Sequence, residues 1–185
     1  MTKALVLMAN GFEELEAVAV IDVLRRGEIE VVTASIHSST EVRGAHGLSV
    51  KADALLSDVA SDEYDAVILP GGGEGMENLR NSDAVIRLLQ DQKACGRLLC
   101  AICAAPLVLV EAGVLDDNQH VTCYPSCQMD LDRPWVNQPV VVHGGVITSQ
   151  APGTALLFAL VILRTLRGSA TASRVAREMV AGISF

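Results

Sequence analysis

Cys103 and Glu16 are the residues best placed to do chemistry, because each interrupts an apolar pattern. Cys103 follows the apolar run 97–102 and precedes the sequence AAP, so we expect it where a strand turns into a helix. Such a turn exposes the side chain and directs backbone N–H groups and the positive helix end at it. These surroundings lower the pKa of a thiol and make it a nucleophile. Cys100 lies within the strand, and we expect it in the core.

Glu16 stands in the middle of the apolar stripe of a predicted helix that ends near Gly27. A carboxyl group that faces the core is desolvated, which raises its pKa and favours the protonated form. A protonated glutamate can donate a hydrogen bond to a thiolate, or act as general acid and base. Glu13 and Glu14 fit the first helical turn, and we expect both to be solvated. The alternative for Glu16 is a place at the end of the stripe, with its carboxylate in solvent.

The sequence GGGEG, residues 71–75, closes another predicted strand. Consecutive glycines let the backbone approach a ligand closely and leave N–H groups free to bind an oxyanion. Glycines end many strands, so the run alone is weak evidence. Its position is more informative, because ligands bind at the carboxyl ends of strands in doubly wound sheets. The glycines and Cys103 are therefore predicted to share one site.

Strands and helices alternate along most of the chain, which predicts an α/β fold with a mostly parallel sheet covered on both faces. The segment 36–52 is predicted to be a hairpin or loop. No linker or repeat is visible, so we expect one domain over residues 1–185. The predicted strands are 3–8, 30–35, 65–70, 97–102, 120–125, 139–144 and 145–150. The predicted helices are the one that ends near Gly27, about 82–95, one after Pro106, about 153–166 and about 170–181.

Composition excludes several classes of partner. The formal net charge is −8 and no Lys/Arg cluster is present, so we expect no specific nucleic acid and no anionic membrane. The uncharged apolar run Ala151–Leu163 has 13 residues, whereas about 20 are needed to span a bilayer. The first residues are too short an apolar run for a signal peptide. These features predict a cytoplasmic protein.

The cysteines and glycines also argue against a cofactor. An odd count of five cysteines in a chain expected in the cytoplasm makes disulfides a poor interpretation. Cys123 and Cys127 lack a second Cys/His pair at zinc-site spacing, so no metal is expected. The first strand has no GxGxxG after it, and GGGEG lacks the Lys-Ser/Thr of a P-loop. We expect no metal, nucleotide or flavin cofactor.

The sequence resembles the DJ-1/PfpI superfamily, and most of all its DJ-1/YajL (ThiJ) branch. The segments GFEELEAV, ILPGGG, AICAAP and TSQAPGT keep the order and spacing of that family over essentially the whole chain. The resemblance implies a flavodoxin-like three-layer sandwich, usually a homodimer, with a nucleophile elbow at Cys103. It also implies that Glu16 is the protonated partner of the sulfur. The N–H groups of Gly72 and Ala104 would form the oxyanion or sulfinate pocket.

Departures from the family pattern narrow this interpretation. Tyr124 stands where the DJ-1 members of this branch have a histidine, and the YajL-like members lack that histidine too. A tyrosine titrates near 10 when unperturbed, so Tyr124 could bond to a substrate or to Glu16 but is a poor general base. His46 and Gln150 occupy positions where the DJ-1 members carry arginines near the thiol. Ala104 follows the cysteine where PfpI-type peptidases have histidine, and no His-x-Glu of an amidotransferase is present.

Two functions from different classes remain. The first is a cysteine-dependent enzyme of the glyoxalase or deglycase type, acting in carbonyl or oxidative stress. Its substrate would be a small reactive dicarbonyl, or a glycated protein or nucleotide. The second is a redox-sensing stress protein or chaperone, in which Cys103 is oxidised to sulfinate. A third interpretation gives the cysteine no functional role: Cys103 is a buried core thiol in an inactive α/β domain. For the homodimer, Val18 and Ile21 lie off the core stripe of the first helix, and one of them could face a partner.

Overall fold

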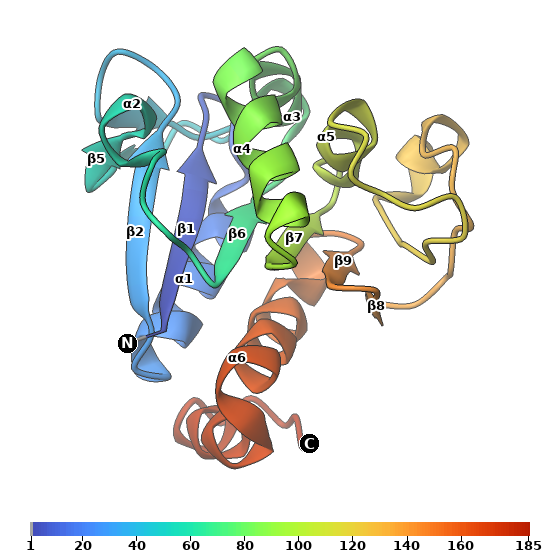
Figure 1. Cartoon of the computed structure of the whole chain (residues 1–185). Helices are drawn as coiled ribbons and strands as arrows, with labels where there is room; N and C mark the ends of the chain where they lie inside the picture. Colours follow the sequence, from blue (N-terminus) through green and yellow to red (C-terminus); the bar gives the residue numbers. More distant parts are fainter. Residues whose placement is uncertain (1) are drawn as a thin grey trace.

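The apolar runs form the central strands of a seven-stranded sheet in the computed structural model, which describes residues 2–185 (Figure 1). Its spatial order is β5-β2-β1-β6-β7-β9-β8, and every neighbouring pair is parallel except β8 and β9. The strands are β1 (Lys3–Met8), β2 (Glu30–Ser35), β5 (Ala54–Leu55), β6 (Ala66–Leu69), β7 (Leu98–Ile102), β8 (Val140–His143) and β9 (Val146–Ser149). The predicted α/β fold with a mostly parallel sheet is confirmed.

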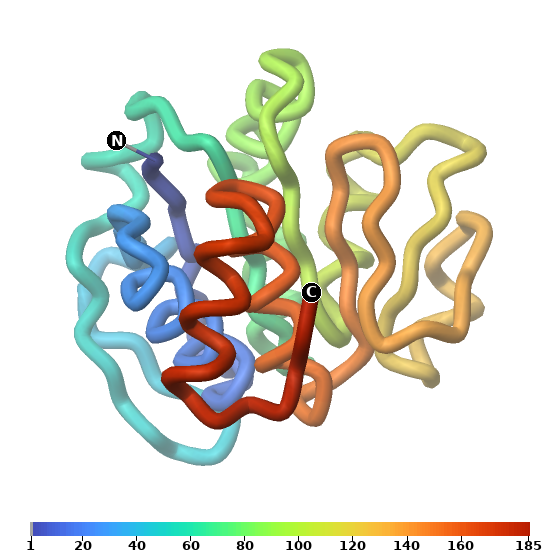
Figure 2. Tube along the Cα trace, turned by 90° about the horizontal axis from the view of Figure 1, so that it is seen from below, coloured from blue at the N-terminus to red at the C-terminus, as the bar shows by residue number. Residues whose placement is uncertain are grey.

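Helices cover both faces of this sheet and make three layers. The longer ones, α1 (Glu14–Arg26) and α6 (Ala155–Glu178), pack against each other on one face, as Figure 2 shows. The other face carries α3 (Gly73–Arg80), α4 (Asp83–Ala94) and α5 (Pro106–Glu111). A single turn, α2 (Leu56–Val59), follows β5. Ser82 caps α4 with its side chain, and Pro106 occupies the first turn of α5, where its missing N–H leaves no bond unmade.

Two separate hydrophobic cores follow from the alternation of side chains along each strand. In β1, Val6 and Met8 face α1 and α6, whereas Leu5 and Leu7 face the opposite layer. All four side chains are buried. Both faces of the strand are therefore apolar, which is why its sequence runs without polar alternation.

The predicted hairpin in the segment 36–52 is present as β3 (Glu41–Arg43) paired antiparallel with β4 (Ser49–Lys51). One predicted strand is wrong. Residues 120–125 form only an isolated bridge, between Val121 and Trp135, followed by a 3-10 helix, η1 (Pro125–Asp130). Within this segment the Thr122 N–H donates to the side-chain oxygen of Thr148 on β9 over 2.8 Å, and not to a backbone carbonyl of the sheet.

The two predicted C-terminal helices are both present: they lie on either side of a kink at Gly168, whose φ is 83°, within the span α6. The short helix η2 (Pro152–Thr154) precedes it. The span Pro152–Glu178 is long and apolar enough to cross a bilayer by length and composition alone. Side chains such as Phe158 and Ile162 are fully buried against the sheet, which is the behaviour of a core helix.

Candidate active site

Cys103 occupies a sharp turn between β7 and α5. Its φ is 64°, in the left-handed region that residues other than glycine seldom adopt, at a cost of about 1–3 kcal/mol. Two backbone bonds hold it there. The Cys103 N–H donates to the Ser149 carbonyl over 3.0 Å, and the Tyr124 N–H donates to the Cys103 carbonyl over 2.8 Å. The turn therefore presents the half-buried thiol at the carboxyl ends of β7 and β9.

Two glycines let the loop after β6 pass close to this thiol. A Cβ on Gly71 would lie 2.6 Å from the Cys103 Cβ and 2.8 Å from Glu16 Oε2. Gly72 has a φ of 92°, and a Cβ there would lie 2.1 Å from the Gly11 carbonyl oxygen. Any larger residue would push the backbone away from the sulfur. Contact requires glycine at both positions, and at Gly72 the positive φ requires it as well.

Glu16 is fully buried in the layer beneath this loop. Its Oε2 accepts the N–H of Gly71 over 2.7 Å, whereas Oε1 is buried without a hydrogen-bond partner of ordinary geometry among residues 2–185. Burial raises the pKa of Glu16 to about 7, and the charge of Glu13 adds to the rise. Hydrogen bonds from Gly71 and from the Cys103 thiol act in the opposite direction on this pKa. Near neutral pH the carboxyl group can therefore hold or release a proton.

The thiol and the carboxyl group oppose each other's ionisation. Burial and the negative charge of Glu16 raise the pKa of Cys103 to about 12, while the N–H groups of Gly72 and Ala104 lower it. The sequence predicted a lowered value, and the difference comes from burial and from the charge on Glu16. A proton on Glu16 removes that charge and leaves the two amides to stabilise a thiolate. The pair therefore resists carrying two negative charges and shares one proton.

The other residues singled out in the sequence lie around this pair. The Tyr124 backbone adjoins Cys103, but its side chain is 43% exposed, and within residues 2–185 no hydrogen bond joins its hydroxyl to Glu16. Cys100 is fully buried in β7. Cys123 is buried and Cys127 half-buried in and beside the turn that carries Tyr124. The structure thus brings Cys103, Glu16, Gly72 and Ala104 into contact, with Tyr124 beside them.

The surroundings of Glu13 and Glu14 differ from those expected from the sequence. Glu13 is 8% exposed and caps α1, since its Oε2 accepts the N–H of Glu16 over 2.9 Å. Glu14 pairs with His46, whose Nδ1 lies 2.9 Å from Glu14 Oε2. The expectation that both acids are solvated is wrong. The partner of Glu14 lies on the distant hairpin loop, whereas Glu13 bonds locally, and its local sign was the position directly before the helix.

An open cavity of about 560 Å³ lies at the same edge of the sheet, and neither Cys103 nor Glu16 is among the residues that line it. Glu13, on one wall, donates its backbone N–H to the Gly71 carbonyl over 3.0 Å. Pro152, on another wall, follows the β9 end that bonds to Cys103. The remaining lining residues are Glu14, Leu15, His46 and Leu48.

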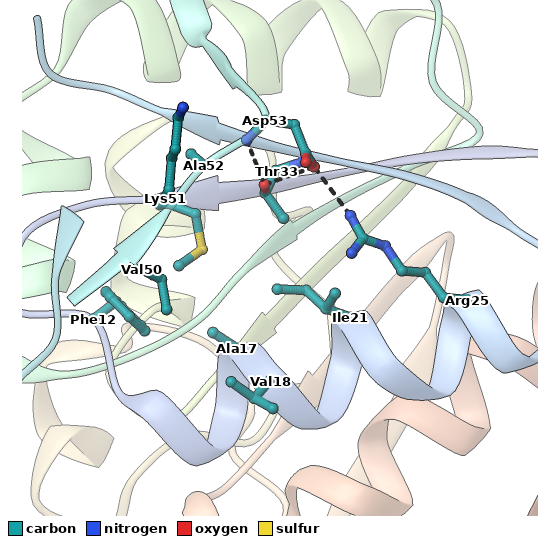
Figure 3. Close-up of a pocket in the computed structure, with 11 residues that line it drawn as sticks. Phe12, Ala17, Val18, Ile21, Arg25, Thr33, Val50, Lys51, Ala52 and Asp53 are labelled. Carbon is teal, nitrogen blue, oxygen red and sulfur yellow. Dashed lines mark hydrogen bonds and ion pairs between the residues drawn. The ribbon is translucent and has the colours of Figure 1, made fainter. Parts of the chain in front are cut away.

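A smaller, mainly apolar cavity of about 150 Å³ lies between α1, the sheet and β4 (Figure 3). Ile21 and Val18 line it, with Val18 also exposed on the outer surface of the helix. Asp53 closes one end by accepting hydrogen bonds from Arg25 and Thr33. Of the two off-stripe residues, Ile21 therefore packs inward and Val18 remains available at the surface.

Comparison with known proteins identifies relatives of this architecture. The family model of the DJ-1/PfpI family matches residues 2–165. The chain is 39% identical over 180 residues to Protein dj-1beta of Drosophila melanogaster, covering 96% of each chain. It is 38% identical over 160 residues to the glutathione-independent glyoxalase DJR-1.2 of Caenorhabditis elegans, covering 84% of this chain and 83% of that protein.

Solved structures give the same result. The crystal structure of Drosophila melanogaster DJ-1beta superimposes with a TM-score of 0.94, covering 97% of both chains. Toxoplasma gondii DJ-1, in an oxidised form, superimposes with a TM-score of 0.92 at 38% identity, covering 97% of this chain and 98% of that one. Some relatives are longer: the chain is 36% identical to Protein DJ-1 homolog B of Arabidopsis thaliana but spans only 41% of its length.

Proposed function

This chain belongs to the DJ-1/PfpI family, and we propose that it is a cysteine-dependent enzyme that converts reactive dicarbonyls, or their adducts, without glutathione. One observation carries the proposal. A fully buried glutamate whose pKa is raised to about 7 shares a proton with a thiol held at a strained turn between two backbone amides. The similarity to a glutathione-independent glyoxalase from Caenorhabditis elegans supports it.

The reaction begins with the proton on Glu16 and the negative charge on the Cys103 sulfur. The thiolate forms a bond to the aldehyde carbon of methylglyoxal, and the C=O electron pair moves to oxygen. The N–H groups of Gly72 and Ala104 stabilise that oxyanion. Glu16 then gives its proton to the oxygen, which completes a hemithioacetal and leaves Glu16 as a carboxylate.

The same carboxylate serves as base in the next step. Glu16 removes the proton from the carbon that carries sulfur and returns it to the neighbouring carbon, while the hydroxyl proton passes from the first oxygen to the second. A ketone thereby becomes an alcohol and the hemithioacetal becomes a thioester. Water cleaves the thioester, releasing lactate and restoring the shared proton. The balance is one methylglyoxal and one water to one lactate and one proton, with no outside oxidant. An adduct of the dicarbonyl with an amine would undergo the same attack and release the amine.

The test is lactate production from methylglyoxal without glutathione, by the native chain, Cys103→Ser and Glu16→Gln. We expect no turnover with Cys103→Ser and a loss of about 10²–10⁴-fold in kcat with Glu16→Gln, because both the acid and the base are removed. Cys100→Ala is the matched control, since it removes a thiol from the same strand and should keep full kcat. Full activity in Cys103→Ser or in Glu16→Gln overturns the proposal.

A second candidate uses the same pocket for oxidation. Two equivalents of hydrogen peroxide would convert the Cys103 thiolate to a sulfinate, releasing two waters. The two amides and a protonated Glu16 are suited to hold the sulfinate oxygens. Mass spectrometry after mild peroxide tests this role: we expect Cys103 to be oxidised before Cys95, although Cys95 is the more exposed thiol. Equal oxidation of the two cysteines contradicts it.

We also propose a homodimer through the outer surface of α1. Leu15, Val18 and Leu48 are large apolar residues exposed to solvent on α1 and the adjoining hairpin. Sedimentation velocity should give a dimer for the native chain and a monomer for Val18→Lys. Val142→Lys, at an equally exposed valine on β8, is the control and should remain dimeric. A monomeric native chain contradicts the proposal.

A further inference from the structure

The strained turn at Cys103 is held by two backbone bonds, and both depend on the end of β9. The Cys103 N–H donates to the carbonyl of Ser149, the last residue of β9, and the Cys103 carbonyl accepts the N–H of Tyr124. The first bond reaches β9 directly. The second depends on the segment 120–125, which pairs with Trp135 by an isolated bridge and does not join the sheet. Whatever fixes this segment against β9 therefore also fixes the turn.

Thr148, the residue before Ser149, fixes the segment through its side chain. Its Oγ1 accepts the Thr122 N–H over 2.8 Å. Thr122 and Thr148 are both fully buried, so water does not replace this bond. In a sheet a backbone carbonyl would accept such an N–H. Here a hydroxyl oxygen does so, and a buried N–H that loses its acceptor is costly.

The alternation of side chains along β9 directs Thr148 toward this segment. Val146 packs in the core beneath α3, α4 and α5, whereas Ile147 packs in the core beneath α1 and α6. Because successive side chains of a strand point to opposite faces, Thr148 lies on the same face as Val146. Val121 and Cys123 pack in the core on that face. The segment therefore lies over the end of β9, on the side to which the Thr148 hydroxyl points.

The other edge of the segment is bonded to a different part of the chain. The Val121 N–H donates to the Pro134 carbonyl over 3.1 Å, and the Val136 N–H donates to the Val121 carbonyl over 2.8 Å. Pro134 and Val136 belong to the stretch that leads into β8. These bonds support the segment but do not tie it to β9. Loss of the Thr148 oxygen should therefore shift the segment and leave the chain folded.

We propose that the Thr148 hydroxyl is a positioning group for the Cys103 turn, acting through the segment 120–125. By holding the Thr122 N–H it places the N–H of Tyr124, which bonds to the Cys103 carbonyl. Thr148 acts through other residues, so it is a positioning residue. The inference deepens the proposed function, because it concerns the same site, but only its kinetic half rests on that function.

The Cys103 turn responds to the loss of a bond because its backbone is strained. A φ of 64° persists only while the surroundings impose it. The N–H groups of Gly72 and Ala104 lower the pKa of Cys103 only while the turn keeps the sulfur beside them. If the bond from Tyr124 loosens, the turn relaxes and burial is left to oppose the thiolate. The thiol should then react more slowly.

Thr122 provides a matched control, because its own hydroxyl makes no bond. Its Oγ1 is buried without a hydrogen-bond partner among residues 2–185. Thr122→Val keeps the backbone N–H that bonds to Thr148, whereas Thr148→Val removes the acceptor of that bond. The two changes are otherwise alike, since each replaces a hydroxyl by a methyl group in a fully buried threonine.

A second control separates positioning from a general loss of stability. Thr33 lies on β2, which β1 and β6 separate from β7, and its hydroxyl donates to Asp53 Oδ2 over 2.8 Å. Thr33→Val therefore removes a bonded hydroxyl far from Cys103. Urea unfolding of this variant and of Thr148→Val shows how much stability each has lost. Thr148→Ala also lacks the acceptor, and it is the second variant with the same expectation as Thr148→Val.

The first test is the rate of Cys103 alkylation by iodoacetamide across the neutral and alkaline pH range. Mass spectrometry follows the Cys103 peptide, with the exposed Cys95 as internal reference. We expect Thr148→Val to slow alkylation of Cys103 several-fold and to move its pH profile upward. Thr148→Ser, which keeps the hydroxyl, should restore the native profile, and Thr122→Val and Thr33→Val should follow it. A native profile in both Thr148→Val and Thr148→Ala overturns the proposal, as does an equal loss in Thr122→Val or in Thr33→Val.

The second test is lactate production from methylglyoxal by the same variants. We expect a several-fold lower kcat in Thr148→Val with little change in KM, and a native kcat in Thr148→Ser. If alkylation follows the expected pattern but the native chain forms no lactate, the positioning role stands and the proposed function fails. If the native chain forms lactate and Thr148→Val has the native kcat, the positioning role is overturned and the proposed function stands.

Discussion

Cys100 and Cys103 are two thiols on one strand and its end, three residues apart, and their surroundings have little in common. Cys100 lies between Ile68 and Ile147 on the neighbouring strands, and burial alone raises its pKa well above the ordinary value. Cys103 has two backbone amides directed at its sulfur, a carboxyl group beside it and a left-handed backbone. The residue type is the same, so the chemistry of Cys103 comes from its neighbours and from the turn.

Burial also has different consequences at Cys100 and at Cys103. Around Cys100 burial excludes every polar group and leaves an inert thiol that contributes only packing. Around Cys103 burial encloses Glu16 together with the thiol, so that each controls the proton of the other. A change that moves one of the two amides away from the sulfur should therefore make Cys103 resemble Cys100 in reactivity, whereas removal of the Glu16 charge should make the two thiols differ more.

Gly72→Ala should have the largest effect on the difference between Cys103 and Cys100. The new Cβ would lie 2.1 Å from the Gly11 carbonyl oxygen and 3.0 Å from the Glu13 nitrogen, both backbone atoms, at a φ of 92°. Strain and overpacking together predict a loss on the order of 4 kcal/mol in the free energy of unfolding. The Gly72 N–H would also move away from the sulfur. Urea unfolding and the rate of Cys103 alkylation measure the two effects.

Gly73→Ala is the matched control for that substitution. A Cβ on Gly73 would meet nothing within 4 Å, and the residue lies in the first turn of α3. We expect a gain of about 0.5 kcal/mol and an unchanged alkylation rate. Equal unfolding free energies for the two variants would mean that the loop does not need glycine at position 72.

Glu16→Gln should alter the pH dependence of stability. The pKa of Glu16 is raised from 4.5 to about 7 in the folded chain, so the folded state binds its proton more tightly. The stabilisation is complete below pH 4.5 and is lost as pH rises through 7, a change of about 3 kcal/mol. Urea unfolding at pH 5 and pH 8 should show this loss in the native chain and a smaller one in the variant. The pKa of His46 is also raised, so His46 contributes a loss of stability of the same sign as pH rises. This contribution is equal in the two chains and cancels when they are compared.

The same variant should lower the pKa of Cys103 and leave that of Cys100 unchanged. Burial still acts on both thiols, but the negative charge beside Cys103 is gone. Thiolate absorbance against pH measures this, with Cys103→Ser in the same background to identify the transition. A Cys103 pKa equal in the native chain and in Glu16→Gln would show that the carboxyl group does not act on the sulfur.

Sequence patterns were sufficient where local chemistry decides the structure. The apolar runs located β1 and β7, and the sequence AAP after Cys103 located the turn before α5. The stripe of α1 indicated that Glu16 faces inward. These features depend on residues within one or two turns of each other, which is the range over which periodicity carries information.

The structural features that the sequence did not predict depend on contacts between distant segments. The helix α3 begins in GGGEG, a poor helix-forming sequence, because Gly75 must approach the Gly11 backbone, which its missing Cβ allows. The segment 120–125 has the composition of a strand, but the N–H groups of His120 and Thr122 donate to the side chains of His143 and Thr148 and not to the backbone of a strand. The Glu14–His46 pair joins residues 32 positions apart. No local pattern contains such information.

The last prediction has the smallest expected effect but compares the two cysteines most directly. It places the same two residues, glycine and alanine, at both positions. At position 103 glycine should be about 1 kcal/mol more stable than alanine, since a φ of 64° costs alanine but not glycine. At position 100, inside β7, glycine should be about 1 kcal/mol less stable than alanine, because it gains freedom in the unfolded chain and loses packing. Urea unfolding of the four variants gives both differences. Opposite signs would show that the fold maintains the strained turn at Cys103 at a cost in stability, as expected of a site kept for its chemistry. The same sign at both positions would mean that the turn carries no strain and that Cys103 differs from Cys100 only in its neighbours.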